Sequence, residues 1–364
     1  MVNTTKTPTL LVMAGGTGGH IFPGIAVAEH LKAQGWHIHW LGTKKRMEAE
    51  IVPAHGFDIS FINIAGIRNK TWLDWLKLPF KLGQSVWQSI QVIRKVKPDV
   101  VLGLGGYASA PGGVAAWLCG KPLVLHEQNA VAGMSNRYLS KIAEKVLCAF
   151  PHAFNDSVKC QVVGNPLRGN IIALEQVIPV QPTSTKKVLV VGGSLGAKVL
   201  NDTVPKAISQ IKRQNIQIWH QTGKGHLASV KSLYQQYGID TSQVILHEFI
   251  DDMASAYQWA DVVICRAGAL TVSELAMAAK PAIFIPLPHA VDDHQTKNAL
   301  YLVERQAAKL IAQKDLNGTS LAQMLNSLFI SDSVIQAMAK AAHDAAHANA
   351  TKDVANICQG LVQR

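Results

Sequence analysis

The 364-residue chain has few cysteines and no long apolar run. Its five cysteines are odd in number, scattered and without a Cys-x-x-Cys pair, which argues against a disulfide framework and a zinc ribbon. Residues 10–14 form an apolar run that is too short for a secretory signal and leads into glycines. No apolar stretch approaches the roughly 20 residues that a membrane-spanning helix needs. Together these absences favour a protein of a reducing cytosol.

Motifs of several nucleotide-binding and metal-binding classes are also missing. GxxxxGK[ST] is absent, which excludes a Walker-type ATPase. The strand ends at Leu41–Thr43 and Gln221–Gly223 offer no acidic residue for a ribose, which disfavours NAD and FAD. His126–Glu127 does not extend to HExxH. Asp292–His294 could hold a metal, but no partner ligands stand at helical or strand spacing, so a solvated loop is favoured.

Acidic residues are scarce in the first half of the chain. The net charge is +11, and residues 1–164 contain 17 Lys and Arg against 9 Asp and Glu, whereas the remainder contains 18 against 15. A basic N-terminal half indicates an anionic partner, such as nucleic acid, an anionic membrane surface or a phosphorylated substrate. A solvated basic face is the alternative that charge alone leaves open.

Strands and helices alternate along the sequence, which predicts an α/β protein. Leu10–Ala14 is expected to be a buried strand that leads through Gly15–His20 into a helix. Lys187–Val191 leads in the same way through Gly192–Ala197 into a helix. A glycine loop before a helix lets backbone N–H groups approach a phosphate, although tight packing without a ligand is the alternative for one loop alone. Because the pattern occurs twice, we predict two Rossmann-like parallel-sheet domains that face a cleft.

The remaining elements set the expected domain bounds. Further strands are expected at residues 36–41, 57–64, 99–104, 122–126, 146–149, 161–163, 216–220, 244–247, 262–265 and 282–285, with a second glycine loop at residues 105–113. The turn-rich segment Gly164–Arg168 and the Pro-, Thr-, Ser- and Lys-rich residues 179–187 enclose the linker. We expect an N-terminal domain over residues 1–164 and a C-terminal domain over residues 165–340. Residues 334–363 are expected to be helical, with residues 341–364 packing back on the N-terminal domain.

One expected helix, residues 71–97 with a break near Pro79, is unusually apolar. Apolar side chains go nearly all round its first half, at Trp72, Leu73, Trp75, Leu76, Leu78, Phe80, Leu82 and Trp87. Lysines stand among them, at Lys70, Lys77 and Lys81. Aromatic residues with lysines suit an interfacial segment on anionic lipid, and a buried core helix is the alternative.

The segment Cys265–Glu274 is a second specific signal. A strand is expected to end at Cys265, Gly268 gives a turn, and Thr271–Glu274 is expected to start a helix. Glu274 would then face the cleft and could accept two hydrogen bonds from ribose hydroxyls. A helix-start charge, which the helix dipole favours, is the alternative.

Nine motifs occur in the order that is typical of one family: GGTGGHIFP, LGT..RMEAEIVP, GGYASAPG, HEQN, VGNPLR, GGSLGA, FIDDM, CRAGALTVSE and PHAVDDHQ. With them, essentially the whole chain resembles the MurG family, the bacterial UDP-N-acetylglucosamine transferases of peptidoglycan synthesis. The resemblance implies the GT-B architecture and transfer of N-acetylglucosamine from its UDP donor to the C4 hydroxyl of the muramoyl sugar of lipid I. The product would be lipid II, formed with inversion to a β-1,4 linkage and without a metal or other cofactor.

The resemblance also implies partners and a location. The expected partners are UDP-N-acetylglucosamine, lipid I and an anionic membrane surface, with other cell-wall synthesis proteins as a further expectation and nucleic acid excluded. The expected location is the cytoplasmic face of the bacterial inner membrane, as a peripheral protein.

Site residues follow from the resemblance by motif. In the donor half, Ser194 and Arg168 would reach the phosphates, the backbone of Ile250 would read uracil, and the nucleotide would be lined by Ala269, Leu270, Thr271, Val272, Ser273 and Glu274, with Glu274 on the ribose. Around the sugar, the resemblance implies Gln295, Asn129, Thr17, Gly18 and Gly19. Two positions depart from the family pattern: Leu195 replaces a usual Gln and Asn69 replaces a usual Gly.

Inversion needs a base for the acceptor hydroxyl, a group worth about 10²–10⁴-fold in rate. His20 is the first candidate, because a neutral imidazole suits neutral pH, and hydrogen bonding to the acceptor or the loop is its alternative role. Glu127 is the second candidate, and its alternative is to orient Asn129 or His20. Other functions stay open: a UDP-sugar transferase with a diacylglycerol or sterol acceptor, a UDP-N-acetylglucosamine 2-epimerase, and a non-catalytic, membrane-docking sugar-nucleotide binder.

Overall fold

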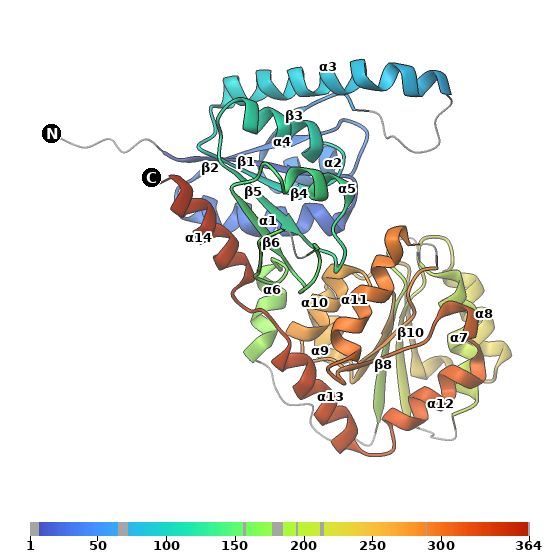
Figure 1. Ribbon diagram of the computed structural model, residues 1–364. Coiled ribbons are helices and arrows are strands. Elements are labelled where there is room, and N and C mark those ends of the chain that lie inside the picture. Colours follow the sequence, from blue (N-terminus) through green and yellow to red (C-terminus); the bar gives the residue numbers. More distant parts are fainter. Residues whose placement is uncertain are drawn as a thin grey trace. The chain divides into compact units, whose positions relative to one another are not determined.

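The computed structural model describes residues 7–64, 72–155, 158–176, 185–193, 196–211, 215–288 and 290–362, although the side chains of residues 72–78, 175, 176 and 291 lie outside this description. The chain divides into two compact units, which are treated separately. Unit 1 comprises Met1–Arg168 and Asn349–Arg364, and unit 2 comprises Gly169–Ala348. Each contains a parallel sheet with helices packed on it (Figure 1). Ser194, Leu195 and Asn69 lie outside the described residues.

Unit 1 is built on a seven-stranded parallel sheet in the order β3-β2-β1-β4-β5-β6-β7. The strands are β1 (Thr9–Ala14), β2 (His37–Gly42), β3 (Asp58–Phe61), β4 (Val100–Gly105), β5 (Leu123–Glu127), β6 (Lys145–Cys148) and β7 (Cys160–Val162). The helices are α1 (Gly18–Ala33), α2 (Glu48–Ala54), α3 (Trp72–Val96), α4 (Ser109–Leu118), α5 (Met134–Leu139) and α14 (Ala350–Val362). The central strands are buried on both faces, as their continuous apolar runs predict.

Two apolar layers enclose this sheet. On one face, Leu10 and Val12 pack with α1 and with Val354 and Cys358 of α14. On the other face, Leu11 and Met13 pack with residues of α3 and α4. The C-terminal helix α14 is therefore part of the core of unit 1, although it follows unit 2 in the sequence.

Unit 2 repeats the architecture with a six-stranded parallel sheet in the order β10-β9-β8-β11-β12-β13. The strands are β8 (Lys186–Val191), β9 (Ile216–Gln221), β10 (Val244–His247), β11 (Val262–Cys265), β12 (Ala282–Phe284) and β13 (Ala308–Leu310). The helices are α6 (Gly169–Ile172), α7 (Lys198–Ser209), α8 (Leu227–Gln236), α9 (Met253–Trp259), α10 (Ala269–Met277), α11 (His294–Val303), α12 (Gly318–Leu328) and α13 (Asp332–Asp344). The predicted pair of Rossmann-like parallel-sheet domains is confirmed.

Two expectations about local structure were wrong, and one strand was not foreseen. The helix expected to break near Pro79 continues through it, because the one hydrogen bond that a proline removes does not end a helix of 25 residues. The helical segment expected over residues 334–363 is two helices, α13 and α14. The strand β13 was missed, since three residues carry too little periodic signal.

The cysteine reading also needs correction, because the structure joins Cys148 and Cys160 in a disulfide. Strands β6 and β7 are neighbours, and the two Cα atoms lie 6.4 Å apart. This distance is within the usual range for a disulfide, and the sequence does not reveal it because the pairing depends on strand order. Cys119, Cys265 and Cys358 are free thiols.

Among the described residues, no helix is both long enough and apolar enough to cross a membrane.

Candidate functional site

The first glycine loop lies at the point where the strand order of unit 1 reverses. Strands β1 and β4 are neighbours, and the loops after both strands meet there. A Cβ atom on Gly106 would lie 2.2 Å from the carbonyl oxygen of Gly15, and Gly106 has a positive φ of 86°. Only glycine permits this backbone contact, which brings the two loops together at the edge where open α/β sheets bind ligands.

A buried carboxylate that the sequence analysis left without a role supports this loop. Glu48 is 1% exposed. One carboxylate oxygen accepts a hydrogen bond from the N–H of Gly16 at 2.9 Å. The other accepts from the Thr43 hydroxyl at 2.7 Å and from the Thr43 N–H at 3.1 Å. Glu48 therefore fixes the end of β2 to the glycine loop, and its only sequence signal is its place in the LGT..RMEAE motif.

His20 lies in the first turn of α1, beside the contact between the two loops. Its Nδ1 lies 2.8 Å from Oε1 of Gln128, which is buried. A Cβ atom on Gly105 would approach Cε1 of His20 to 3.2 Å, so the glycine leaves room for the ring. Of the other predicted residues of this loop, Thr17 is exposed, and Gly18 and Gly19 are half-buried.

The second candidate base, Glu127, is buried, and its carboxylate accepts four hydrogen bonds. One carboxylate oxygen accepts hydrogen bonds from the N–H of Asn129 at 3.0 Å and from its side-chain amide at 3.2 Å. The other accepts from the N–H of Gly133 at 3.0 Å and from the amide of Asn136 at 2.8 Å. Four donors around one buried carboxylate favour the role of orienting Asn129 over that of a base.

Arg168, the last residue of unit 1, lies close to α1. Its guanidinium carbon is 5.5 Å from the ring centroid of Phe22, which follows His20 by two residues on α1. A cation over an aromatic ring is attracted by the face of the ring, which holds the guanidinium beside α1. Arg46 is held in the same way, 5.1 Å from the ring centroid of Tyr107.

The glycine loop that follows β8 has the corresponding place in unit 2, between the neighbouring strands β8 and β11. A Cβ atom on Gly196 would lie 2.2 Å from the carbonyl oxygen of Thr222, and Gly196 has a φ of 74°. Its N–H donates to the carbonyl of Gly193 at 2.9 Å. The side chain of Gln221 donates to the same carbonyl at 2.8 Å. Gly193 and Gly196 are therefore held at the end of β9.

A buried histidine supports the helix that follows this loop. His220 is fully buried, and its Nε2 lies 3.1 Å from Oδ1 of Asn201 on α7. Its Nδ1 lies 3.0 Å from the hydroxyl of Tyr234. Asn201 in turn donates to the carbonyl of Thr222 at 2.9 Å. Desolvation lowers the pKa of His220 to about 3, so the ring is neutral at physiological pH.

Glu274 lies on α10, which begins at Ala269 rather than at the expected Thr271. The carboxylate is therefore in the second helical turn and is 8% exposed. It accepts a hydrogen bond of 2.9 Å from the hydroxyl of Tyr257 on α9. Tyr257 is a supporting residue that the sequence analysis missed.

The other residues predicted to line the nucleotide are not equivalent. Ala269 and Val272 are buried, and Val272 is fully so, whereas Leu270, Thr271 and Ser273 are half-buried. Ile250 is buried and precedes the N-cap of α9, where Asp252 accepts from the N–H of Ser255 at 3.1 Å. A backbone contact is therefore the more suitable role for Ile250 and for Val272.

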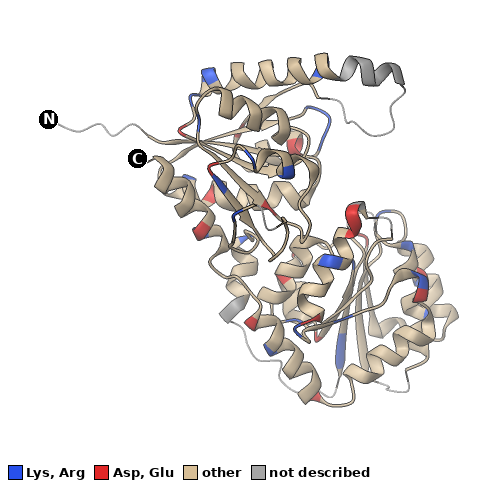
Figure 2. Ribbon diagram, in the orientation of Figure 1, with Lys and Arg blue, Asp and Glu red and all other residues tan. Residues whose placement is uncertain are grey.

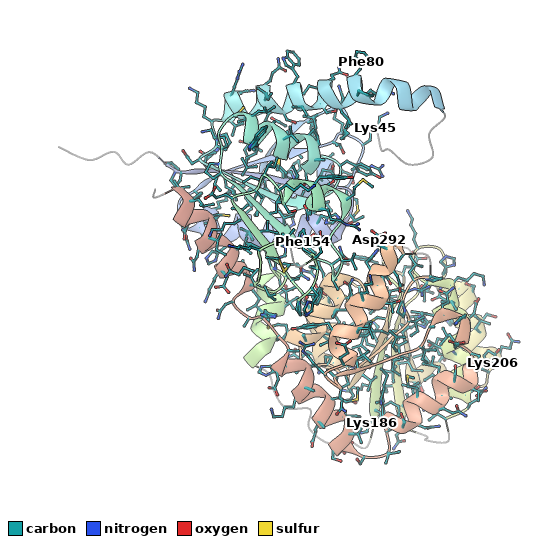
Figure 3. All side chains as sticks on the ribbon, viewed as in Figure 1. Lys45, Phe80, Phe154, Lys186, Lys206 and Asp292 are labelled. Atoms are coloured by element: carbon teal, nitrogen blue, oxygen red, sulfur yellow. A yellow bond between two sulfur atoms is a disulfide. The ribbon has the colours of Figure 1, made fainter. Side chains whose placement is uncertain are left out.

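The loop before α11 has unusual backbone geometry. Asp292 and Asp293 both have left-handed φ values, 55° and 53°, and Figure 3 shows Asp292 at the loop ahead of the helix. Such conformations are strained for residues other than glycine and are concentrated at functional sites. Gln295, in the first turn of α11, accepts a hydrogen bond from the N–H of Leu287 at 2.9 Å. In the described part of the chain, no three His, Cys, Asp or Glu side chains form a group that could hold a metal ion.

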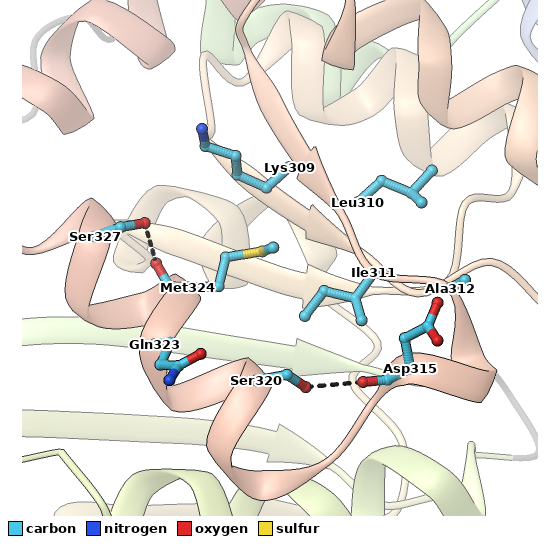
Figure 4. A pocket seen from close by; sticks show the side chains of 9 residues that line it. All are labelled: Lys309, Leu310, Ile311, Ala312, Asp315, Ser320, Gln323, Met324 and Ser327. Carbon is cyan, nitrogen blue, oxygen red and sulfur yellow. Dashed lines mark hydrogen bonds between the residues drawn. The ribbon is translucent and has the colours of Figure 1, made fainter.

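Unit 2 also has a pocket of about 490 Å³ between β13 and α12 (Figure 4). It is lined by Lys309, Leu310, Ile311, Ala312, Asp315, Ser320, Gln323, Met324 and Ser327. None of the predicted site residues is among them, so this pocket is separate from the residues that the motifs select.

An exposed apolar surface lies on the other side of unit 1 from α1 and α14. Phe80 and Trp87 on α3 are 82% and 59% exposed, and Figure 3 shows Phe80 projecting from the helix. Helix α3 packs on α4, where Trp117 and Leu118 are also exposed. The described side chains of α3 include Lys81, Arg94 and Lys95 but no acidic residue (Figure 2). Trp72, Trp75 and Leu76 belong to the part of α3 whose side chains are not described.

Comparisons with known proteins agree with this architecture, since two Rossmann-like sheets in one chain constitute the GT-B fold. The N-terminal domain of glycosyltransferase family 28 matches residues 10–148, and the C-terminal domain of that family matches residues 187–356. The crystal structure of Acinetobacter baumannii MurG is 37% identical, with a TM-score of 0.84 over 97% of this chain and 99% of that one.

Curated relatives are similar over their full length. A protein of Colwellia psychrerythraea is 59% identical over 99% of this chain and 94% of its own length. One of Shewanella violacea is 54% identical over the whole of both chains. Both are named UDP-N-acetylglucosamine–N-acetylmuramyl-(pentapeptide) pyrophosphoryl-undecaprenol N-acetylglucosamine transferase. The chain therefore belongs to glycosyltransferase family 28, among its MurG transferases.

Proposed function

We propose that this chain transfers N-acetylglucosamine from UDP-N-acetylglucosamine to the C4 hydroxyl of the muramoyl sugar of lipid I, which gives lipid II. The observation that carries the proposal is the similarity of the whole chain to transferases named for this reaction, at up to 59% identity. The two glycine loops, each at the switch point of its sheet, support it, because such loops suit the phosphates of donor and acceptor.

The base and the phosphate-binding loop are proposed to belong to different units. In an inverting transfer the acceptor oxygen forms a bond to the anomeric carbon while the bond from that carbon to the phosphate oxygen breaks. The hydroxyl proton passes to the base, for which we propose His20 in unit 1. The departing UDP gains negative charge, which the backbone N–H groups of the loop at Gly192–Ala197, Ser194 and Arg168 would stabilise without a metal.

Recognition of the donor is proposed for residues of unit 2. Glu274, held by Tyr257, would accept hydrogen bonds from the ribose hydroxyls. The backbone at Ile250 would read uracil, and Ala269–Ser273 would line the nucleotide. Gln295 would bind the sugar. In unit 1, Asn129 and the loop Thr17–Gly19 would complete the sugar site, and Glu127 would orient Asn129.

We further propose that the exposed surface of α3 and α4 docks on anionic lipid at the cytoplasmic face of the inner membrane. Phe80, Trp87 and Trp117 supply exposed aromatic area, and Lys81 supplies positive charge beside it. This combination is typical of interfacial segments, and a lipid-linked acceptor requires access to a membrane.

The direct test is incubation of the purified protein with radiolabelled UDP-N-acetylglucosamine and a lipid I analogue. We expect label in a disaccharide-lipid. Release of free labelled sugar without transfer would indicate a 2-epimerase instead. Transfer to diacylglycerol but not to the lipid I analogue would contradict the assigned acceptor.

A further inference from the structure

A continuous line of hydrogen bonds connects His20 to the backbone near the end of unit 1. His20 Nδ1 lies 2.8 Å from Gln128 Oε1. The Gln128 amide donates to Nδ1 of His126 and to the carbonyl of His126, both at 3.1 Å. His126 Nε2 lies 2.9 Å from the carbonyl oxygen of Gly164. His126 and Gln128 are almost fully buried, with 0% and 1% of their surface exposed.

The direction of every bond in this line is set by two backbone carbonyl oxygens, those of Gly164 and His126, which can only accept. A carbonyl oxygen only accepts, so Nε2 of His126 must carry the proton that points at Gly164. In a neutral imidazole the lone pair is then on Nδ1, which accepts from the Gln128 amide. The oxygen of that amide consequently faces Nδ1 of His20, which must donate. Neutral His20 is thereby left with its lone pair on Nε2.

We propose that Gln128 and His126 are positioning residues that hold His20 in the tautomer whose Nε2 can accept the proton of the acceptor hydroxyl. This inference rests on the proposed function in one respect, namely that His20 is the base. The role of the two residues is not to touch substrate but to exclude the wrong tautomer. Aqueous imidazole side chains prefer the proton on Nε2, which would leave no lone pair there.

The line works only if His126 stays neutral. A protonated His126 would present an N–H to the Gln128 amide, the amide would have to turn over, and its N–H would then face His20. Burial opposes this: desolvation lowers the pKa of His126 to about 4, although the Gly164 carbonyl and the charge of Glu127 act in the opposite direction. The Gln128 backbone is also fixed, since Asn165 donates to its carbonyl at 3.1 Å.

Charged side chains on the neighbouring elements have other partners. Glu127 on β5 accepts from Asn129, Gly133 and Asn136. Glu48 on α2 accepts from Gly16 and Thr43, and Arg168 stacks on Phe22. The orientation of the line therefore depends on the carbonyl oxygens of Gly164 and His126 rather than on a formal charge.

The test reads the tautomer directly, in long-range ¹H–¹⁵N spectra of ¹⁵N-histidine-labelled protein, with the His20 signals assigned from their loss in His20→Gln. We expect a protonated Nδ1 and an unprotonated Nε2 in the wild type. In Gln128→Met the signals should move toward the opposite tautomer, and kcat should fall about 10- to 100-fold, part of the value of a general base, with both KM values unchanged. His126→Phe removes one of the two acceptors of the Gln128 amide and keeps the backbone carbonyl at that position, so it should move the His20 signals less than Gln128→Met does.

A conservative variant and a distant control separate positioning from general damage. Gln128→Glu keeps an acceptor for Nδ1–H of His20 but loses the two bonds that the amide donates to His126, so it should keep the wild-type tautomer of His20 at the cost of a lower melting temperature. The acidic limb of its pH–rate profile should move to higher pH, because a carboxylate stabilises the imidazolium. The control is Gln88→Met, which removes an amide that accepts from the N–H of Asn63 at 2.8 Å, and it should leave tautomer and kcat unchanged.

Two results would overturn the inference: a wild-type His20 with its proton on Nε2, or a Gln128→Met variant with an unaltered tautomer. Neither depends on turnover. A protein that fails to transfer the sugar but shows the expected tautomer would contradict the proposed function and leave the hydrogen-bond line standing.

Discussion

Replacement of Glu274 by alanine should weaken binding of UDP-N-acetylglucosamine far more than binding of the acceptor. The carboxylate is 8% exposed, so its hydrogen bonds form with little competition from water. Loss of charged hydrogen bonds to ribose should cost about 1.5–3 kcal/mol. That range corresponds to an increase of roughly 10- to 150-fold in the dissociation constant of the donor.

The structure adds a second consequence, which supplies the control. Glu274 also accepts a hydrogen bond from the hydroxyl of Tyr257, which is 1% exposed, so removal of the carboxylate should lower stability by about 1 kcal/mol through the loss of this bond. Tyr257→Phe removes the same structural bond but keeps the carboxylate. It should therefore reproduce the loss of stability and leave most of the donor affinity.

Isothermal titration of both variants with the donor, together with their melting curves, separates the two roles. Unchanged donor affinity in Glu274→Ala would refute the ribose role. Equal losses of affinity in Glu274→Ala and Tyr257→Phe would show that the carboxylate acts only by holding α9 and α10 together.

Three further predictions concern membrane binding, metals and acid. Phe80→Ser combined with Trp87→Ser should reduce co-sedimentation with anionic vesicles, because each change removes at most about 1.5–3 kcal/mol of apolar burial, and it should spare activity on a soluble acceptor. The control is Ile330→Ser, at a residue of unit 2 that is 79% exposed. A large drop in the melting temperature of the double variant would contradict the membrane role. Turnover should survive excess EDTA after dialysis, and loss that a divalent ion restores would argue against metal-free chemistry. The unfolding free energy should fall as pH drops from about 6.5 toward 4, because His126 and His220 take up protons in the unfolded chain that their buried rings do not bind. Urea titrations should show a fall of about 1.6 kcal/mol per histidine between pH 6.5 and 5, and a flat profile would show that neither ring is held neutral.

The parts of the fold that could be predicted are those written locally in the sequence. Buried parallel strands such as β1 and β4 are continuous apolar runs, and the glycine loops that follow them announce the turn into a helix. The parts that could not be predicted depend on which strands become neighbours. Glu48 meets Gly16 across 32 residues, and His20 meets Gln128 across 108, because the order of the sheet brings their strand ends together.

The motif HEQN shows how much more the sequence could have offered. Side chains along an extended segment alternate between its two sides, so His126 and Gln128 are expected on one side and Glu127 and Asn129 on the other, although β5 itself ends at Glu127. The structure follows this alternation: the first pair forms the line that ends at His20, whereas Glu127 binds Asn129, Gly133 and Asn136. If the motif had been interpreted as an extended segment with alternating side chains, His126 and Gln128, which orient the proposed base, would have been separated from Glu127 and Asn129, which belong to the proposed sugar site. That interpretation would not have supplied the Gly164 carbonyl, 38 residues further along, which together with the carbonyl of His126 gives the first pair its direction.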